Sequence, residues 1–249
     1  MRETPFKPWY RFVPSLFTSS NLVCGIIGTY LSLEGRIDLA FIMMLIAAFF
    51  DFIDGFAARL LKVSGDFGKE LDSLADLISF GLLPGAMVFF VLKTNLGVHI
   101  VSFSNLSFQY CIFLLIPILI PVFSALRLAK FNIDERQKSE FIGLPTPANA
   151  IFFASLCYSL VFKPESFLHS LNHPIIITVF VLFFSFLLVS EIPLFALKFS
   201  NFSWGKNKLR YTFIIASVAL IVIFKIPGFT GVILLYILLS IIRNIVTKR

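Results

Sequence analysis

Long apolar segments fix the class of fold before any single residue is considered. The chain has 249 residues, of which 58% are hydrophobic and 14% charged. A segment needs about 20 mainly apolar residues to cross the hydrocarbon core of a bilayer as a helix. Eight segments qualify, at residues 14–33, 38–61, 71–92, 108–129, 147–163, 174–195, 210–226 and 228–243. The sequence therefore predicts an all-α, polytopic bundle of about eight transmembrane helices, with residues 1–249 in a single membrane domain.

The basic residues predict how this bundle is oriented. If both termini are cytoplasmic, 17 of the 21 Lys and Arg residues fall on the inner side. The four on the outer side are Arg36, Lys93, Lys163 and Lys225. Because Lys and Arg collect in cytoplasmic loops, we expect both termini to be cytoplasmic and the protein to lie in the inner, cytoplasmic membrane. The net charge of +7 could also suggest a nucleic-acid partner, but we expect none, because the basic residues are scattered at the ends of apolar segments.

Aspartates interrupt the second apolar segment, which continues from IDLAFIMMLIAAFF into DFIDGFAARLLK without a break signal. Asp51, Asp54, Gly55 and Ala58 are spaced i, i+3, i+4 and i+7, so they share one face of a helix, with Arg59 beside it. Lipid does not tolerate such a polar face, so we expect it to look into a cavity of the protein. Gly55 leaves space beside the acids, where a phosphate or sugar could approach the backbone.

A second pair of aspartates, Asp72 and Asp76, lies one helical turn apart at the start of the third segment. Two helices that each offer two carboxylates to the gap between them form a cluster that needs cations in order to stay ionised. One solution is a bound divalent metal. The other is a set of buried ion pairs with Arg59, Lys62 or Lys69. The metal is favoured, because ion pairing alone does not require this spacing.

The stretch 51–76 resembles, at every fixed position, the signature of the CDP-alcohol phosphatidyltransferase family. The pattern is Asp, two residues, Asp-Gly, two residues, Ala-Arg, eight residues, Gly, three residues, Asp, three residues, Asp. The matching residues are Asp51, Asp54, Gly55, Ala58, Arg59, Gly68, Asp72 and Asp76. KELDSLADLISFGLLPG, ALRLAKFNI and FIGLPTPANA further resemble the bacterial and archaeal phosphatidylserine synthase branch of that family. The likeness is strongest over residues 15–155.

This resemblance implies transfer of a phosphatidyl group from CDP-diacylglycerol to the hydroxyl of L-serine, with release of CMP, by a homodimer among membrane lipids. It implies that Asp51, Asp54 and Asp72 hold a pair of Mg²⁺ or Mn²⁺ ions at a site that faces the cytoplasm. Asp76 would share a metal contact or act as the general base for the serine hydroxyl. Residues implied to line the CDP site are Gly55, Ala58, Arg59 and Gly68.

Three polar residues outside the signature are further candidates for substrate binding. Asn21, in the first segment, could contact the nucleotide or could hydrogen-bond between helices. Arg127 and Lys130 end the fourth segment on the side of the aspartates, where the carboxylate of serine needs a cation. Anchoring of basic residues at the cytoplasmic face also accounts for Lys130, but less well for Arg127.

Two alternatives remain open at this point. Another acceptor of the same family, glycerol 3-phosphate or an inositol phosphate, would bring an extra phosphate and favour a denser basic pocket. A polytopic ion or metabolite transporter could also use intramembrane acids, but these should then lie near the bilayer midplane on broken helices.

Overall fold

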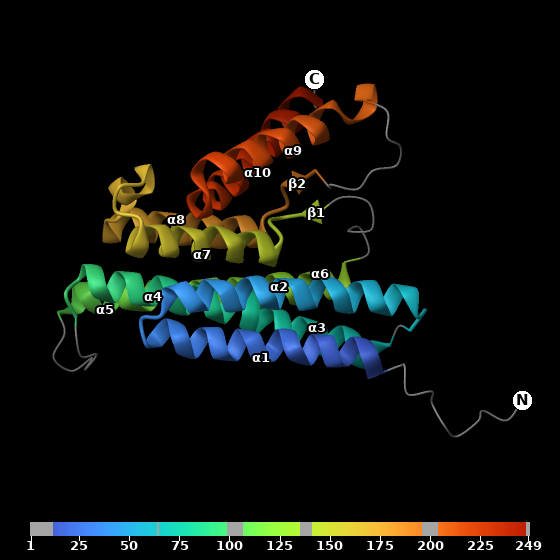
Figure 1. Cartoon of the computed structure of the whole chain (residues 1–249), viewed down its shortest axis with the longest axis horizontal. Coiled ribbons are helices and arrows are strands. Elements are labelled where there is room, and N and C mark those ends of the chain that lie inside the picture. The colour runs from blue at the N-terminus through green and yellow to red at the C-terminus, as the bar shows by residue number, and fades with distance from the viewer. Residues whose placement is uncertain (1–11, 64, 99–106, 135–140, 196–203, 248–249) are drawn as a thin grey trace, which may run out of the picture.

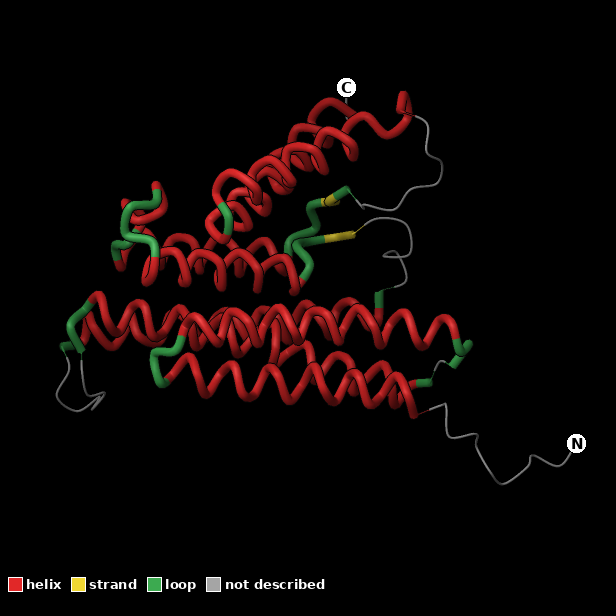
Figure 2. Tube along the Cα trace, in the orientation of Figure 1, coloured by secondary structure: helices red, strands yellow, loops and turns green. Residues whose placement is uncertain are grey.

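The computed structural model describes residues 12–63, 65–98, 107–134, 141–195 and 204–247, and most of them are helical (Figures 1 and 2). The α-helices are α1 (Val13–Leu33), α2 (Ile37–Leu60), α3 (Asp66–Asp76), α4 (Leu83–Asn95), α5 (Phe108–Leu115), α6 (Leu119–Ile133), α7 (Thr146–Phe162), α8 (Pro174–Val189), α9 (Trp204–Phe224) and α10 (Ile226–Thr247). Shorter segments are the π-helix η2 (Leu77–Leu82) and the 3-10 helices η4 (Ile116–Ile118) and η6 (Phe167–Leu171). Two-residue strands, β1 (Phe141–Ile142) and β2 (Pro193–Leu194), pair antiparallel.

The predicted polytopic helical architecture is confirmed. Because η2 joins α3 to α4 and η4 joins α5 to α6, the described residues contain, besides the short η6, eight helical segments in the predicted order. Six of these segments are long and apolar enough to cross a membrane, and the exceptions are α7 and α8. These two have 17 and 16 residues. Each is therefore about 25 Å long at 1.5 Å per residue, which is shorter than the hydrocarbon core.

Several predicted helix boundaries were wrong. The third helix begins at Asp66 instead of residue 71, so Asp66 and Glu70 are exposed residues of its first turns. The sixth helix ends at Val189 instead of residue 195, because Ser190 is extended and Pro193 pairs in β2. Apolar composition alone did not reveal this break.

The helices lie in layers (Figure 1). Helices α1 to α6 form a thick first layer, in which α1 lies on the side away from α7 and α8. Helices α7 and α8 lie against its other side, and α9 and α10 are inclined across the far side of α7 and α8. Helix α1 packs along α2, α3, η2 and α4, and α7 contacts both α4 and α10. The first turn of α1, the end of α2, the start of α3 and the end of α6 meet at one end of the bundle.

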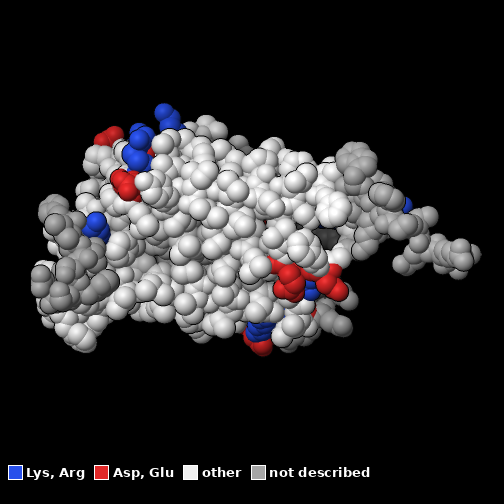
Figure 3. All heavy atoms as spheres, turned by 90° about the horizontal axis from the view of Figure 1, so that it is seen from below, with Lys and Arg blue, Asp and Glu red and all other residues white. Residues whose placement is uncertain are grey.

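The outer surface of the bundle is suited to lipid. On the face shown in Figure 3, charged side chains form separate groups, and a broad band of uncharged side chains lies between them. Large apolar side chains are exposed on several helices. For example, Phe52 on α2 is 66% exposed and Leu126 on α6 is 53% exposed. A contiguous apolar surface of this extent indicates contact with a membrane. The chain is therefore a polytopic membrane protein.

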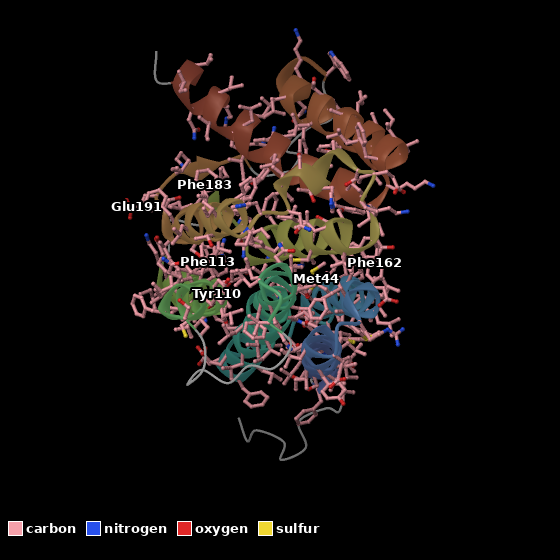
Figure 4. All side chains as sticks on the ribbon, turned by 90° about the vertical axis from the view of Figure 1, so that its left-hand side faces the viewer. Met44, Tyr110, Phe113, Phe162, Phe183 and Glu191 are labelled. Atoms are coloured by element: carbon pink, nitrogen blue, oxygen red, sulfur yellow. The ribbon has the colours of Figure 1, made fainter. Side chains whose placement is uncertain are left out.

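Aromatic rings pack α7 against α8 and against α2. The rings of Phe152 on α7 and Phe184 on α8 are stacked with centroids 3.9 Å apart, and both side chains are fully buried. Viewed end on, Met44 of α2 lies between the layers, whereas Glu191 lies at the margin of the molecule (Figure 4). The rings of Phe41 on α2 and Tyr158 on α7 lie 5.5 Å apart, so apolar packing also holds α7 against the layer that carries the aspartates.

The described residues agree with the predicted separation of basic side chains along the bundle. Arg59, Lys62 and Lys69 lie at the end where α2 meets α3, and Arg36 and Lys93 lie at the opposite end. Several residues in the predicted count lie outside the described part of the chain. They are Arg2, Lys7, Arg11, Arg136, Lys138, Lys198, Lys248 and Arg249.

Candidate active site

The structure brings together three of the four aspartates as a candidate metal site. Each of Asp51, Asp72 and Asp76 offers one carboxylate oxygen, and these oxygens lie within 4.8 Å of one another. Asp51 lies on α2, whereas the other two lie on α3, as the spacing predicts. Asp76 is buried, and Asp51 and Asp72 are partly exposed. The site therefore reaches from the interior of the bundle towards its surface.

Asp54 lies beside this cluster and is close enough to interact electrostatically with Asp51, Asp72 and Asp76. Its side chain is buried, and its Oδ2 accepts a hydrogen bond of 2.7 Å from the hydroxyl of Thr18. Four carboxylates held so close repel one another, and burial makes this repulsion stronger. A cation that binds among them removes the repulsion.

The donor set fits a divalent metal better than ion pairs. Oδ1 of Asp72 is buried without a hydrogen-bond partner, so one oxygen of the cluster has no partner within the fold. Among the described residues, none of the four aspartates forms an ion pair with the nearby basic side chains. Nε of Arg59 donates instead to the carbonyl of Gly55, and Nζ of Lys69 donates to the carbonyl of Asn132. Carboxylate oxygens are the ligands that Mg²⁺ and Mn²⁺ prefer.

An open pocket of about 1040 Å³ lies beside Asp54 and Asp72, at the end of the bundle where α2 meets α3. Its walls come from the first turns of α1, the end of α2, and the start of α3. The lining residues are Phe12, Pro14, Ser15, Thr18, Asp54, Gly55, Ala58, Lys62, Val63, Gly65, Asp66, Phe67, Gly68, Lys69 and Asp72. This volume is sufficient for a small-molecule ligand or the headgroup of a larger substrate.

Three of the residues predicted to bind substrate, Gly55, Ala58 and Gly68, line this pocket. A Cβ atom added at Gly55 or Gly68 would meet nothing within 4 Å, so both glycines border open space. Arg59 is not among the lining residues, and its side chain is exposed. Only the Nε donor of Arg59 is used by the Gly55 carbonyl, so its Nη groups remain the donors that could turn towards a phosphate in the pocket.

Asn21 is fully buried on α1, where it contacts Asp76. Its Nδ2 donates a hydrogen bond of 3.1 Å to Oδ1 of Asp76, while its own Oδ1 has no hydrogen-bond partner. The predicted interhelical hydrogen bond is therefore present. The predicted contact with a nucleotide stays a prediction, because Asn21 does not line the open pocket.

Arg127 and Lys130 have different environments, although they are one turn apart on α6. Arg127 is 6% exposed, its Nε donates to the carbonyl of Leu144, and it lies close enough to Asp76 for an electrostatic interaction. Lys130 forms an ion pair of 3.2 Å with Glu191, with the lysine side chain 35% exposed. Arg127 is thus the better placed of the two to bind an anionic group beside the aspartates.

The family model for CDP-alcohol phosphatidyltransferase matches residues 11–188, which include α1 to α7, all but the last residue of α8, and the whole aspartate cluster. The chain belongs to the CDP-alcohol phosphatidyltransferase family. A CDP-diacylglycerol–serine O-phosphatidyltransferase of Bacillus subtilis is 32% identical over 181 residues, covering 73% of this chain and 88% of the relative. The protein of the same name from Helicobacter pylori strain 26695 is 30% identical over 239 residues, covering 93% and 91%. An archaetidylserine synthase of Methanothermobacter thermautotrophicus is 32% identical, covering 57% and 56%.

Residues outside the family signature complete the pocket, and sequence reasoning missed most of them. Lys62 and Lys69 were considered only as ion-pair partners, yet both line the pocket. Lys62 is placed there by a left-handed backbone with φ of 52°, immediately after α2. Thr18 was not among the predicted site residues. Its position three residues before Asn21, on the same helical face, was the available signal.

Proposed function

We propose that this protein transfers the phosphatidyl group of CDP-diacylglycerol to the hydroxyl of L-serine and releases CMP. The observation that carries the proposal is the close approach of Asp51, Asp72 and Asp76, which places three carboxylates of the family signature around one point. The open pocket beside them can hold a nucleotide headgroup. Relatives that cover most of the chain carry the name of the serine-specific enzyme. Membership of a transferase family weighs against a transporter.

The position of the site suits one lipid substrate and one soluble substrate. The helix that carries Asp72 and Asp76 runs from Asp66 to Asn95 and has 30 residues. At about 45 Å it is longer than the hydrocarbon core, so its first turns can stand in the headgroup region. Phe52 and Phe56 are exposed on the outer face of α2, beside pocket residue Gly55. The diacyl tails can remain against this face while the CDP group enters the pocket.

The reaction needs a deprotonated alcohol and charge neutralisation on the leaving group. The hydroxyl oxygen of serine bonds to the phosphorus that carries diacylglycerol, the bond from that phosphorus to the CMP oxygen breaks, and Asp76 receives the hydroxyl proton. A pair of Mg²⁺ or Mn²⁺ ions, when bound by Asp51, Asp54, Asp72 and Asp76, would neutralise the pyrophosphate. Lys62 and Lys69 lie in the pocket wall, where they can attract the same phosphates.

Arg127 is the residue that would bind the carboxylate of the acceptor serine. Among the described residues it is the one buried Lys or Arg side chain. A single buried guanidinium suits one carboxylate, and Arg binds carboxylates with two parallel hydrogen bonds. A phosphorylated acceptor would call for further buried cations. Lys130 can support Arg127 only after leaving Glu191. The arrangement thus favours serine over glycerol 3-phosphate or an inositol phosphate.

An acceptor screen tests this choice. Purified protein with labelled CDP-diacylglycerol and Mn²⁺ should release CMP with L-serine about 100-fold faster than with glycerol 3-phosphate or inositol phosphate, because one buried Arg leaves an extra phosphate unpaired. A reaction without acceptor gives the background. Faster release with either phosphorylated acceptor would assign the protein to another branch of the family.

We further propose that the site faces the cytoplasm from the inner membrane, and that the protein forms a homodimer, as the family resemblance implies. Single cysteines in a background lacking Cys24, Cys111 and Cys157 test the orientation. Ile133→Cys, at the exposed end of α6, should react with an impermeant maleimide only from the cytoplasmic side. His169→Cys, at the opposite end of the bundle, should react only from outside. Labelling of Ile133→Cys from outside would reverse the proposed orientation.

A further inference from the structure

Helix α1 presents two hydrogen-bond donors to the aspartate cluster. Thr18 donates to Oδ2 of Asp54 on α2 over 2.7 Å, and Asn21 donates to Oδ1 of Asp76 on α3 over 3.1 Å. The two donors are three residues apart, so they lie on one face of α1, and both are buried. One helix therefore contacts a carboxylate on each of the two helices that carry the signature.

Close packing between the backbones of α1 and η2 fixes the position of these two donors along the axis of α1. A Cβ atom added at Gly25, one turn beyond Asn21, would lie 2.8 Å from Cα of Ser79 in η2. The backbones of α1 and η2 therefore touch, which only glycine permits at this contact. A shift of α1 along its axis would break this contact and both hydrogen bonds together.

Each donor occupies one oxygen of its carboxylate. The hydroxyl of Thr18 also lies 3.1 Å from the carbonyl of Pro14, but its single proton favours the shorter contact with a charged acceptor. A carboxylate held at one oxygen keeps its rotamer and directs the other oxygen to a ligand. Hydrogen bonds of this kind orient metal ligands, and their loss changes metal affinity or activity.

The buried amide of Asn21 is better explained by this orienting role than by stability. Its Oδ1 is buried without a partner. A buried acceptor without a partner destabilises a fold, whereas an apolar side chain of similar size does not. Leucine at this position would remove the unpaired oxygen. It would also leave Oδ1 of Asp76 without its donor.

We propose that Thr18 and Asn21 are positioning residues, with Thr18 orienting Asp54 for the cation at the nucleotide pocket and Asn21 orienting Asp76 for the acceptor hydroxyl. This rests on the proposed function. It assigns Asn21 to the acceptor side of the site, in place of the expected contact with the nucleotide. Replacement of Thr18 should therefore weaken cation binding, whereas replacement of Asn21 should slow transfer to the acceptor hydroxyl.

The experiment compares Thr18→Val and Asn21→Leu with Ser19→Ala. Ser19 is exposed on α1 and bonds only to its own helix, at the carbonyl of Ser15. Mn²⁺ binding is followed by electron paramagnetic resonance, and kcat and KM by CMP release with serine. Thr18→Val should raise the Mn²⁺ concentration at half-saturation about 10- to 100-fold, and Thr18→Ser should restore it. Asn21→Leu should lower kcat about 10- to 100-fold, with KM for CDP-diacylglycerol within about twofold of the unmodified protein.

Each outcome decides the proposal. If Thr18→Val binds Mn²⁺ as Ser19→Ala does, or Asn21→Leu keeps the kcat of Ser19→Ala, the positioning role is wrong. If Asn21→Leu does not fold, Asn21→Ala is measured in its place by the same criteria. Failure of the unmodified protein to release CMP with serine would overturn the proposed function instead. The Mn²⁺ comparison between Thr18→Val and Thr18→Ser would still test the role of Thr18, because it needs no acceptor.

Discussion

Asp76→Asn is expected to abolish phosphatidyl transfer to serine while CDP-diacylglycerol binding persists. Asp76 lies one turn further along α3 than Asp72, is buried at 8% exposure and is not among the residues that line the open pocket. An amide keeps the size of the side chain and an oxygen for metal contact, but it cannot accept the hydroxyl proton. Loss of a general base lowers kcat about 10²- to 10⁴-fold, which corresponds to about 3–5 kcal/mol in the barrier.

The measurement separates chemistry from binding. CMP release is followed with saturating serine, and CDP-diacylglycerol binding is titrated on the same preparation. Glu70→Gln is the matched control, because Glu70 is an exposed carboxylate on the same helix. Asp72→Asn should weaken nucleotide and metal binding together, since Asp72 lines the pocket and contributes to the cluster. If Asp76→Asn transfers to serine at a rate close to that of Glu70→Gln, the proton leaves through another group or through water.

The sequence was sufficient to predict the helices and the acids that face each other. The spacing of Asp51, Asp54, Gly55 and Ala58 fixed one helical face, and α2 carries it without interruption. Lipid does not tolerate that face, so it had to look into the interior of the protein. Asp72 and Asp76, one helical turn apart, marked the second helix that lines the same interior. The residues that share one face of a helix follow from their spacing, which can be read directly from the sequence.

The contacts that complete the site depend on packing between distant segments. Thr18 and Asp54 are 36 residues apart, and Asn21 and Asp76 are 55 apart. No pattern in the sequence specifies that α1, rather than another apolar helix, lies against the cluster. The contact between Gly25 and Ser79 allows α1 to lie this close to η2, through the absence of a side chain. Likewise, the exposed position of Arg59 follows from the direction of one side chain, which spacing does not determine.

Chelation is expected to abolish CMP release, and added Mg²⁺ or Mn²⁺ should restore it. The reason lies in the four neighbouring carboxylates, which repel one another and have no ion pair among the described residues, and in Oδ1 of Asp72, which has no partner. Removal of a bound cation also removes its stabilisation of the folded state, so the unfolding temperature should fall in excess chelator and recover with the metal. Matched additions of Na⁺ control for ionic strength, and Mn²⁺ titration should give two ions per chain. In Asp51→Ala, metal should no longer raise the unfolding temperature to the same extent. Undiminished CMP release in excess chelator would exclude a metal-dependent reaction and would leave Arg127, Lys62 and Lys69 as the groups that neutralise the pyrophosphate.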